Sequence, residues 1–166
     1  MQILEHINSR EDLLAVPWEQ EAQLCQEIRQ WLVQNVAKTG GHLASNLGIV
    51  ELQVAIEKEF DTRRDRLVFD VGHQSYVHKI LTGRRDAMTG LRTLDGISGF
   101  PKPDESETDA FVAGHASNAV SVALGMARAR TLQGADYNVI ALLGDGAMTG
   151  GLFYEGMNDA GASGSR

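Results

Sequence analysis

The chain has 166 residues, a length that suits one globular domain with a substantial hydrophobic core. Its formal net charge of −7 argues against a nucleic-acid partner. A single cysteine, Cys25, rules out an internal disulfide and fits a reducing compartment such as the cytoplasm. No apolar run approaches membrane-spanning length, and the N-terminal stretch lacks the pattern of a signal peptide.

The first third of the chain has the periodicity of helices. Residues 19–38 repeat apolar side chains at the 3.6-residue spacing of an amphipathic helix. Residues 39–46, which begin Thr-Gly-Gly-His, predict a turn. A second helix is expected at 47–60, where Leu47, Val50 and Val54 keep helical spacing.

The remainder alternates short apolar runs with helical segments. Buried strands are expected at three runs of apolar residues, 66–71, 110–114 and 138–143. Helices are expected after them at 74–81, 117–132 and 150–160, the second with Ser117 as its N-cap. Between them, residues 90–109 contain two prolines and no period, so they predict a flexible surface loop. Its acidic part, 104–109, is expected to act as a flap or to be disordered.

This order predicts an α/β fold, with a mostly parallel sheet and flanking helices. In such sheets ligands bind beyond the carboxyl ends of the strands. Each expected strand is followed by a glycine and then a polar residue: His73, His115 and Asp145. If the strands are parallel, these side chains converge on one rim. A further histidine, His42, follows its own Gly-Gly turn.

The Gly144-Asp145-Gly146 stretch would lie between a strand end and a helix. Free backbone N–H groups at such a position favour phosphate, and Gly146 and Ala147 leave room for its oxygens. A carboxylate next to phosphate requires a cation, and Mg²⁺ combines both kinds of ligand. The residues therefore indicate a diphosphate held through Mg²⁺ by Asp145, although the tripeptide alone is more typical of an ordinary turn.

The histidines allow two further interpretations. His42 and His73 each fit an ordinary turn residue when considered singly, or an acid–base group, because imidazole titrates near neutrality. Zinc binding is disfavoured because the histidines show no short ligand spacing such as His-x-x-x-His.

Longer motifs carry a family resemblance. The chain resembles the N-terminal part of the 1-deoxy-D-xylulose-5-phosphate synthase family, a transketolase-like branch of the thiamine diphosphate enzymes. The resemblance covers nearly the whole chain. It implies a thiamine diphosphate-binding fold cut inside its first, diphosphate-binding domain at residues 1–166, with the pyrimidine-binding and C-terminal domains absent. The motifs that carry it are "KTGGHLASNLGIVEL", "RLVFDVGHQSYVHKILTGRRD", "GISGFPKPDESETDAF", "GHASNAVSVALGMARAR" and the Gly-Asp-Gly run.

The resemblance also implies roles for individual residues. His42 matches a catalytic histidine near the reacting centre that assists proton transfer, and His73 matches a catalytic histidine that also touches the cofactor. Asp145 matches the Mg²⁺ ligand. The remaining matches are contacts with thiamine diphosphate, chiefly through the backbone, at Gly114, His115, Ala116, Gly146 and Ala147.

For the parent enzyme, the resemblance implies a transferase that condenses pyruvate with D-glyceraldehyde 3-phosphate. The products are 1-deoxy-D-xylulose 5-phosphate and carbon dioxide, and the enzyme is a cytoplasmic homodimer without nucleic-acid or membrane partners. The family's second Mg²⁺ ligand and its cofactor-activating glutamate lie beyond the matched segment. We therefore expect the chain alone to be inactive, to bind cofactor weakly or not at all, and to dimerise or aggregate through an exposed sheet edge.

Two alternatives differ in class. One is ketol transfer between sugar phosphates by a transketolase-type enzyme, which a comparison of pyruvate with a ketose phosphate as substrate would separate. The other is a noncatalytic phosphate-binding or assembly module, for which Asp145→Ala would leave cofactor affinity unchanged.

Overall fold

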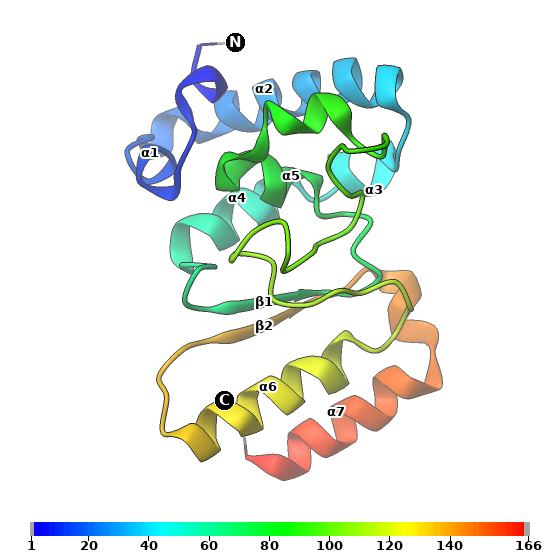
Figure 1. The fold of residues 1–166 in the computed structure, drawn as a ribbon. Coiled ribbons are helices and arrows are strands. Elements are labelled where there is room, and N and C mark those ends of the chain that lie inside the picture. The colour runs from blue at the N-terminus through cyan, green and yellow to red at the C-terminus, as the bar shows by residue number, and fades with distance from the viewer. Residues whose placement is uncertain (1, 165–166) are drawn as a thin grey trace. The chain divides into compact units, whose positions relative to one another are not determined.

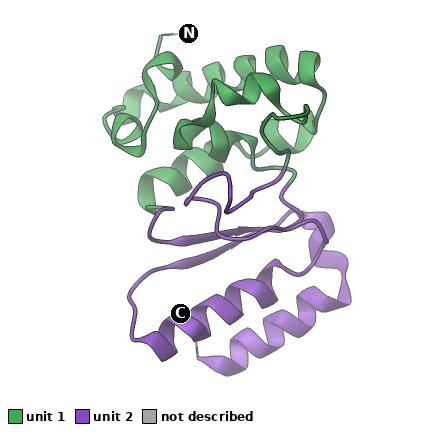
Figure 2. Ribbon diagram, in the orientation of Figure 1, with its two compact units in different colours: residues 1–61, 73–99 green, residues 62–72, 100–166 purple. Residues whose placement is uncertain are grey.

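The computed structural model describes residues 2–164 and divides the chain into two compact units (Figure 2). Unit 1 ends at residue 61 and resumes over 73–99. Unit 2 comprises 62–72 and the chain from residue 100 onward. The chain therefore passes from one unit to the other three times.

Unit 1 is helical. Its long helix α2, Trp18–Thr39, confirms the helix expected at 19–38 and is followed by Gly40, whose φ of 73° suits glycine. The next long helix, α4, spans Val50–Glu59, within the expected 47–60. The shorter helical elements are η1 (Leu4–His6), α1 (Arg10–Leu14), α3 (Leu43–Leu47), α5 (Tyr76–Lys79), η2 (Ile80–Arg84) and η3 (Ala87–Gly90).

Two expectations for unit 1 need correction. The turn expected at 39–46 is partly wrong, because Leu43–Leu47 forms α3 and buries Asn46 completely. The helix expected at 74–81 begins later, at Tyr76, and changes at Ile80 into the wider π-helical turn η2. The helical backbone is broken at Gly83, whose φ of 88° lies outside the helical region.

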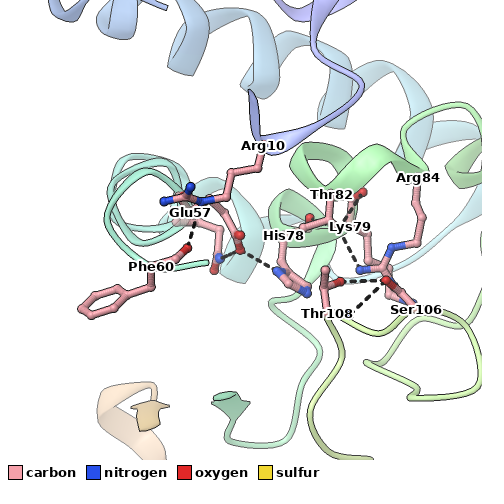
Figure 3. A network of polar contacts seen from close by, with 10 residues as sticks. Arg10, Glu57, Phe60, His78, Lys79, Thr82, Arg84, Ser106 and Thr108 are labelled. Atoms are coloured by element: carbon pink, nitrogen blue, oxygen red, sulfur yellow. Dashed lines mark hydrogen bonds and ion pairs between the residues drawn. The ribbon is translucent and has the colours of Figure 1, made fainter. Parts of the chain in front are cut away.

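A buried polar network joins α4 to α5 inside unit 1 (Figure 3). The Glu57 carboxylate lies 2.5 Å from Nδ1 of His78 and accepts a 2.7 Å hydrogen bond from the Gln53 amide. Arg10 caps the end of α4 by donating to the carbonyl groups of Glu57, Lys58 and Phe60. These contacts fix α5 against α4. They also supply hydrogen-bond partners to the two network side chains on α4, Gln53 and Glu57, which are buried and polar.

Unit 2 contains the sheet. Strands β1, Arg66–Phe69, and β2, Val139–Leu142, are parallel, with Arg66 opposite Val139 and Phe69 opposite Leu142. Helix α6 packs against both strands and lies beside α7 (Figure 1). The core of the unit forms where Val68 meets Ala119 and Ala123. The helical elements are α6 (Ala119–Gln133), η4 (Asp145–Thr149) and α7 (Gly151–Ser163).

The parallel α/β architecture is confirmed, but the strand expected at 110–114 is wrong: in the described residues the sheet contains β1 and β2 alone. The segment is apolar for another reason, because Phe111 packs onto the core cluster without joining the ladder. The absence of regular structure through most of 90–109 is confirmed. The expectation of a wholly surface loop is wrong, because Leu91, Ile97 and Asp109 are buried. Among the described residues, no helix combines the length and apolar character that crossing a bilayer requires.

Glu27, on α2, binds the N-terminal end of the described chain. Its carboxylate accepts hydrogen bonds from the backbone N–H groups of Gln2, Ile3 and Leu4 at 2.9 to 3.2 Å, and from the Gln23 amide at 2.9 Å. Burial alone would raise the pKa of this carboxyl, but the hydrogen bonds outweigh burial and lower the pKa to about 2. The folded unit therefore favours the ionised form.

Replacement of Glu27 by Gln should destabilise the chain at neutral pH by about 1–3 kcal/mol, because hydrogen bonds to a charged acceptor are lost. Since the folded pKa lies below that of an unfolded glutamate, the stabilisation is complete above about pH 4.5 and is lost as the pH falls toward about 2. Urea unfolding across this range should show wild type and variant converging in acid. Glu19→Gln, at an exposed position on the same helix, is the control. A stability difference that persists unchanged in acid would contradict the prediction.

Candidate functional site

His42 and His73 lie side by side in unit 1. His42 immediately precedes α3, and His73 follows the turn after β1. Their ring centroids are 5.1 Å apart and the rings meet edge to face, with an interplanar angle of 63°. His42 is exposed and His73 is half-buried. The structure therefore brings the two histidines proposed for proton transfer into direct contact, with one of them open to solvent.

A single buried amide fixes the backbone around both histidines. The side-chain NH₂ of Asn46 donates to the carbonyl groups of His42, at 2.6 Å, and His73, at 2.8 Å. Its oxygen accepts from the backbone N–H of Tyr76 at 2.8 Å. Asn46 has no exposed surface, so these partners replace water completely for the side chain.

Tyr76 binds the backbone of His42. Its hydroxyl accepts a hydrogen bond from the backbone N–H of His42 at 3.3 Å, and the ring is fully buried. The Gly40-Gly41 turn makes this approach possible, because a Cβ at Gly41 would lie 2.8 Å from the tyrosine oxygen. Gly41 therefore has a steric role, in addition to its φ of 141°.

In unit 2, the carboxylate of Asp70 joins the end of β1 to the start of α6. Asp70 is 1% exposed, and its two oxygens accept from the backbone N–H groups of Ser117, at 2.9 Å, and Ala119, at 3.0 Å. The expectation that Ser117 caps this helix is therefore wrong. Asp70 supplies the oxygen acceptors that an N-cap side chain normally provides. The next residue, Val71, has a φ of 61°, which is strained for a β-branched side chain.

Asp145, Gly146 and Ala147 occupy the first positions of η4, directly after β2. Because β1 and β2 are parallel, Asp70 and Asp145 both follow the carboxyl ends of their strands. Asp145 and Gly146 are exposed, and an added Cβ at Gly144 or Gly146 would meet open space. This surface suits a ligand that approaches the backbone closely.

The amides expected to bind phosphate already have short-range partners. The N–H of Gly146 donates to the Asp145 carboxylate at 2.9 Å, and the N–H of Ala147 donates to the Gly144 carbonyl at 3.0 Å. A bound diphosphate would exchange these bonds for its own oxygens. Gly114, His115 and Ala116 lie exposed in the segment before α6 and precede Ser117, which Asp70 holds.

The candidate residues thus form two groups, His42 with His73 in unit 1 and the loops around 114–116 and Asp145 in unit 2. That both groups serve one cofactor stays a prediction. Within residues 2–164, no cluster of three or more histidine, cysteine, aspartate or glutamate side chains could hold a metal ion. Mg²⁺ bound at Asp145 would take phosphate and water oxygens as its other ligands.

Comparison with known proteins decides the family. Residues 4–166 match the protein family described as 1-deoxy-D-xylulose-5-phosphate synthase. The chain belongs to this family. It is 57% identical over 160 residues to the 1-deoxy-D-xylulose-5-phosphate synthase of Syntrophomonas wolfei, covering 96% of this chain and 25% of the relative. The enzyme of the same name from Thiobacillus denitrificans is 56% identical over 161 residues, covering 97% of this chain and 26% of the relative.

The synthase of Natranaerobius thermophilus is 54% identical over 159 residues, covering 96% of this chain. The chain spans about a quarter of the length of these 1-deoxy-D-xylulose-5-phosphate synthase relatives. The family membership confirms the expected resemblance and its thiamine diphosphate-binding fold.

Sequence reasoning missed the buried residues that, within each unit, fix the backbone near the candidate residues. Asn46, Asp70 and Tyr76 all lie inside the quoted family motifs, but none carries a feature of catalysis or metal binding. The available signal was polarity: Asn46 comes directly before the apolar pattern of the helix expected at 47–60, and Asp70 lies inside the apolar strand expected at 66–71. Buried polar side chains in such places usually satisfy backbone groups.

Asn46→Ala should destabilise the chain by about 2–4 kcal/mol, because it leaves two carbonyl groups and one N–H without their buried partner. Tyr76→Phe should have a smaller effect, about 0.5–1.5 kcal/mol, since it removes one long hydrogen bond. Urea unfolding gives both values. A nuclear Overhauser effect between the His42 and His73 rings reports their contact, and it should weaken in Asn46→Ala. Asn35→Ala, which removes a bond to the Trp31 carbonyl on α2, is the control. A ring contact of unchanged strength in folded Asn46→Ala would contradict the prediction.

Proposed function

We propose that this chain supplies the diphosphate- and Mg²⁺-binding part of a thiamine diphosphate-dependent transferase. The reaction is the condensation of pyruvate with D-glyceraldehyde 3-phosphate to 1-deoxy-D-xylulose 5-phosphate and carbon dioxide. The observation that carries this proposal is the position of Asp145-Gly146-Ala147 at the carboxyl end of a parallel strand, in a chain matched to the family over residues 4–166. When bound, thiamine diphosphate supplies the electron sink for the carbon chemistry.

Asp145 is the proposed Mg²⁺ ligand. Its carboxylate is exposed and is engaged only by the neighbouring Gly146 N–H among the described residues, so it can turn toward a cation with little loss. Oxygen donors of this kind suit Mg²⁺, which also takes diphosphate oxygens. The exposed backbone at Gly114, His115, Ala116 and Gly146, together with the half-buried Ala147, is the proposed surface for the diphosphate.

His42 and His73 are the proposed proton-handling groups. The edge-to-face contact of their rings limits rotation of both side chains, and Asn46 fixes the backbone that carries them. His42 is exposed and is the better placed of the two to exchange protons with substrate or solvent. His73, half-buried, is the better suited to a fixed contact with cofactor.

A chimera tests the proposed function directly. Residues 1–166 would replace the matching quarter of the Thiobacillus denitrificans synthase, and product formation from pyruvate and D-glyceraldehyde 3-phosphate would be measured. We expect an active chimera, and a loss of apparent Mg²⁺ affinity of at least about 100-fold in Asp145→Ala, since a direct metal ligand is removed. The exposed Asp104→Ala is the control. The 166-residue chain alone should release no carbon dioxide from pyruvate.

Three outcomes would contradict this proposal. An active chimera that tolerates Asp145→Ala would remove the metal role. Activity with a ketose phosphate donor but not with pyruvate would favour a transketolase-type reaction. Measurable binding of thiamine diphosphate and Mg²⁺ by calorimetry, with equal affinity for the wild-type chain and Asp145→Ala, would favour a noncatalytic module.

We further propose that the functional protein is a cytoplasmic homodimer and that the chain alone self-associates. Leu152, Tyr154 and Met157 on α7 are exposed, and each described strand of the sheet has one neighbour only. Both features favour association. Light scattering should show a dimer or larger species whose mass falls on dilution. A monomer over the whole concentration range would contradict self-association of the chain.

A further inference from the structure

We propose that Ser117 is a positioning residue that fixes the shape of the Asp145 loop, η4, for diphosphate binding. This inference rests on the proposed function of that loop. Ser117 acts through the backbone of Ala147, whose carbonyl oxygen accepts a hydrogen bond from the Ser117 hydroxyl. Four observations within unit 2 support it.

The first observation is the backbone of Ser117 itself. Its φ of 73° lies in the left-handed region, which serine seldom adopts. Strained backbone of this kind persists only where its surroundings impose it, and it concentrates at functional sites. Here the Asp70 carboxylate imposes it by accepting the N–H groups of Ser117 and Ala119.

The second observation is where this backbone directs the side chain. The hydroxyl of Ser117 donates a 2.7 Å hydrogen bond to the carbonyl oxygen of Ala147, thirty residues further along the chain. Ser117 is buried, so water competes little for the bond. The strained conformation thus joins the segment containing Gly114, His115 and Ala116 to the loop containing Asp145.

The third observation is steric. A Cβ at Gly150 would overlap the Ser117 hydroxyl and lie 2.9 Å from Ser117 Cβ. Gly150 immediately precedes α7 and has a φ of −80°, so its backbone does not require glycine. The absence of a side chain therefore serves to admit Ser117.

The fourth observation is how little else holds the loop. Its other hydrogen bonds are local: Gly146 to Asp145, Ala147 to Gly144, and the Thr149 hydroxyl to the Gly146 carbonyl. Among the described residues, the Ser117 bond is the only one that ties the backbone of η4 to a residue distant in sequence. Removing it should free the loop while leaving the strands and α6 in place.

The test compares Ser117→Ala, Ser117→Gly and Ser121→Ala in the 166-residue chain by nuclear magnetic resonance. Ser117→Ala removes the hydroxyl, and Ser117→Gly removes it while also relieving the strain, so the test survives if Ser117→Ala fails to fold. Ser121→Ala removes a serine hydroxyl from α6 and leaves the Ser117–Ala147 bond intact. The measurements are amide hydrogen exchange over 145–149 and the carbonyl ¹³C resonance of Ala147.

We expect exchange in the loop to be about fivefold faster in both Ser117 variants, with a displaced Ala147 carbonyl resonance and unchanged protection in α6. Ser121→Ala should match wild type. Wild-type loop exchange in Ser117→Gly would overturn the inference, as would an equal loss of protection across α6 and the loop. No cofactor is present, so this test can fail while the chimera stays active, and it can succeed even if Asp145 binds no metal.

Discussion

The buried carboxylate of Asp70 is the constraint on which the rest of unit 2 depends. Asp70 directly follows β1. Its oxygens accept from the backbone N–H of Ser117, two residues before α6, and from that of Ala119, the first residue of α6, so one carboxylate links strand and helix. Burying an ionised group is costly unless hydrogen bonds satisfy it, and two amides at a helix N-terminus satisfy it well. Because Asp70 holds the backbone of Ser117, the Ser117 hydroxyl reaches the Ala147 carbonyl in the loop after β2.

In unit 1 a neutral side chain, Asn46, has the same role of binding buried backbone groups. Asn46 satisfies three backbone groups from separate segments, and in doing so sets where His42 and His73 lie. In both units a fully enclosed polar side chain organises residues that are themselves exposed or half-exposed. Reactive groups need access to solvent or ligand. Their positions must therefore be fixed by neighbouring side chains that are buried and contact neither solvent nor ligand.

Sequence patterns predicted α2, β1 and β2 well because each depends on local spacing of apolar residues. The family motifs located the candidate site residues, which local periodicity alone would not have distinguished from turns. The strand at 110–114 failed because an apolar run records burial, whereas a strand also needs a hydrogen-bonded partner. Ser117 failed as a cap because the actual acceptor, Asp70, lies 47 residues earlier in the chain.

The hydrogen bonds from residues 2–4 to Glu27 have a consequence for recombinant production of the protein. The backbone N–H groups of those residues donate hydrogen bonds to a side chain of α2. A chain that begins at residue 5 would lack three of the N–H donors to the buried Glu27 carboxylate. Of the contacts described above, only the Gln23 amide would remain. Designers should therefore place tags and cleavage sites so that the amides of Gln2, Ile3 and Leu4 survive.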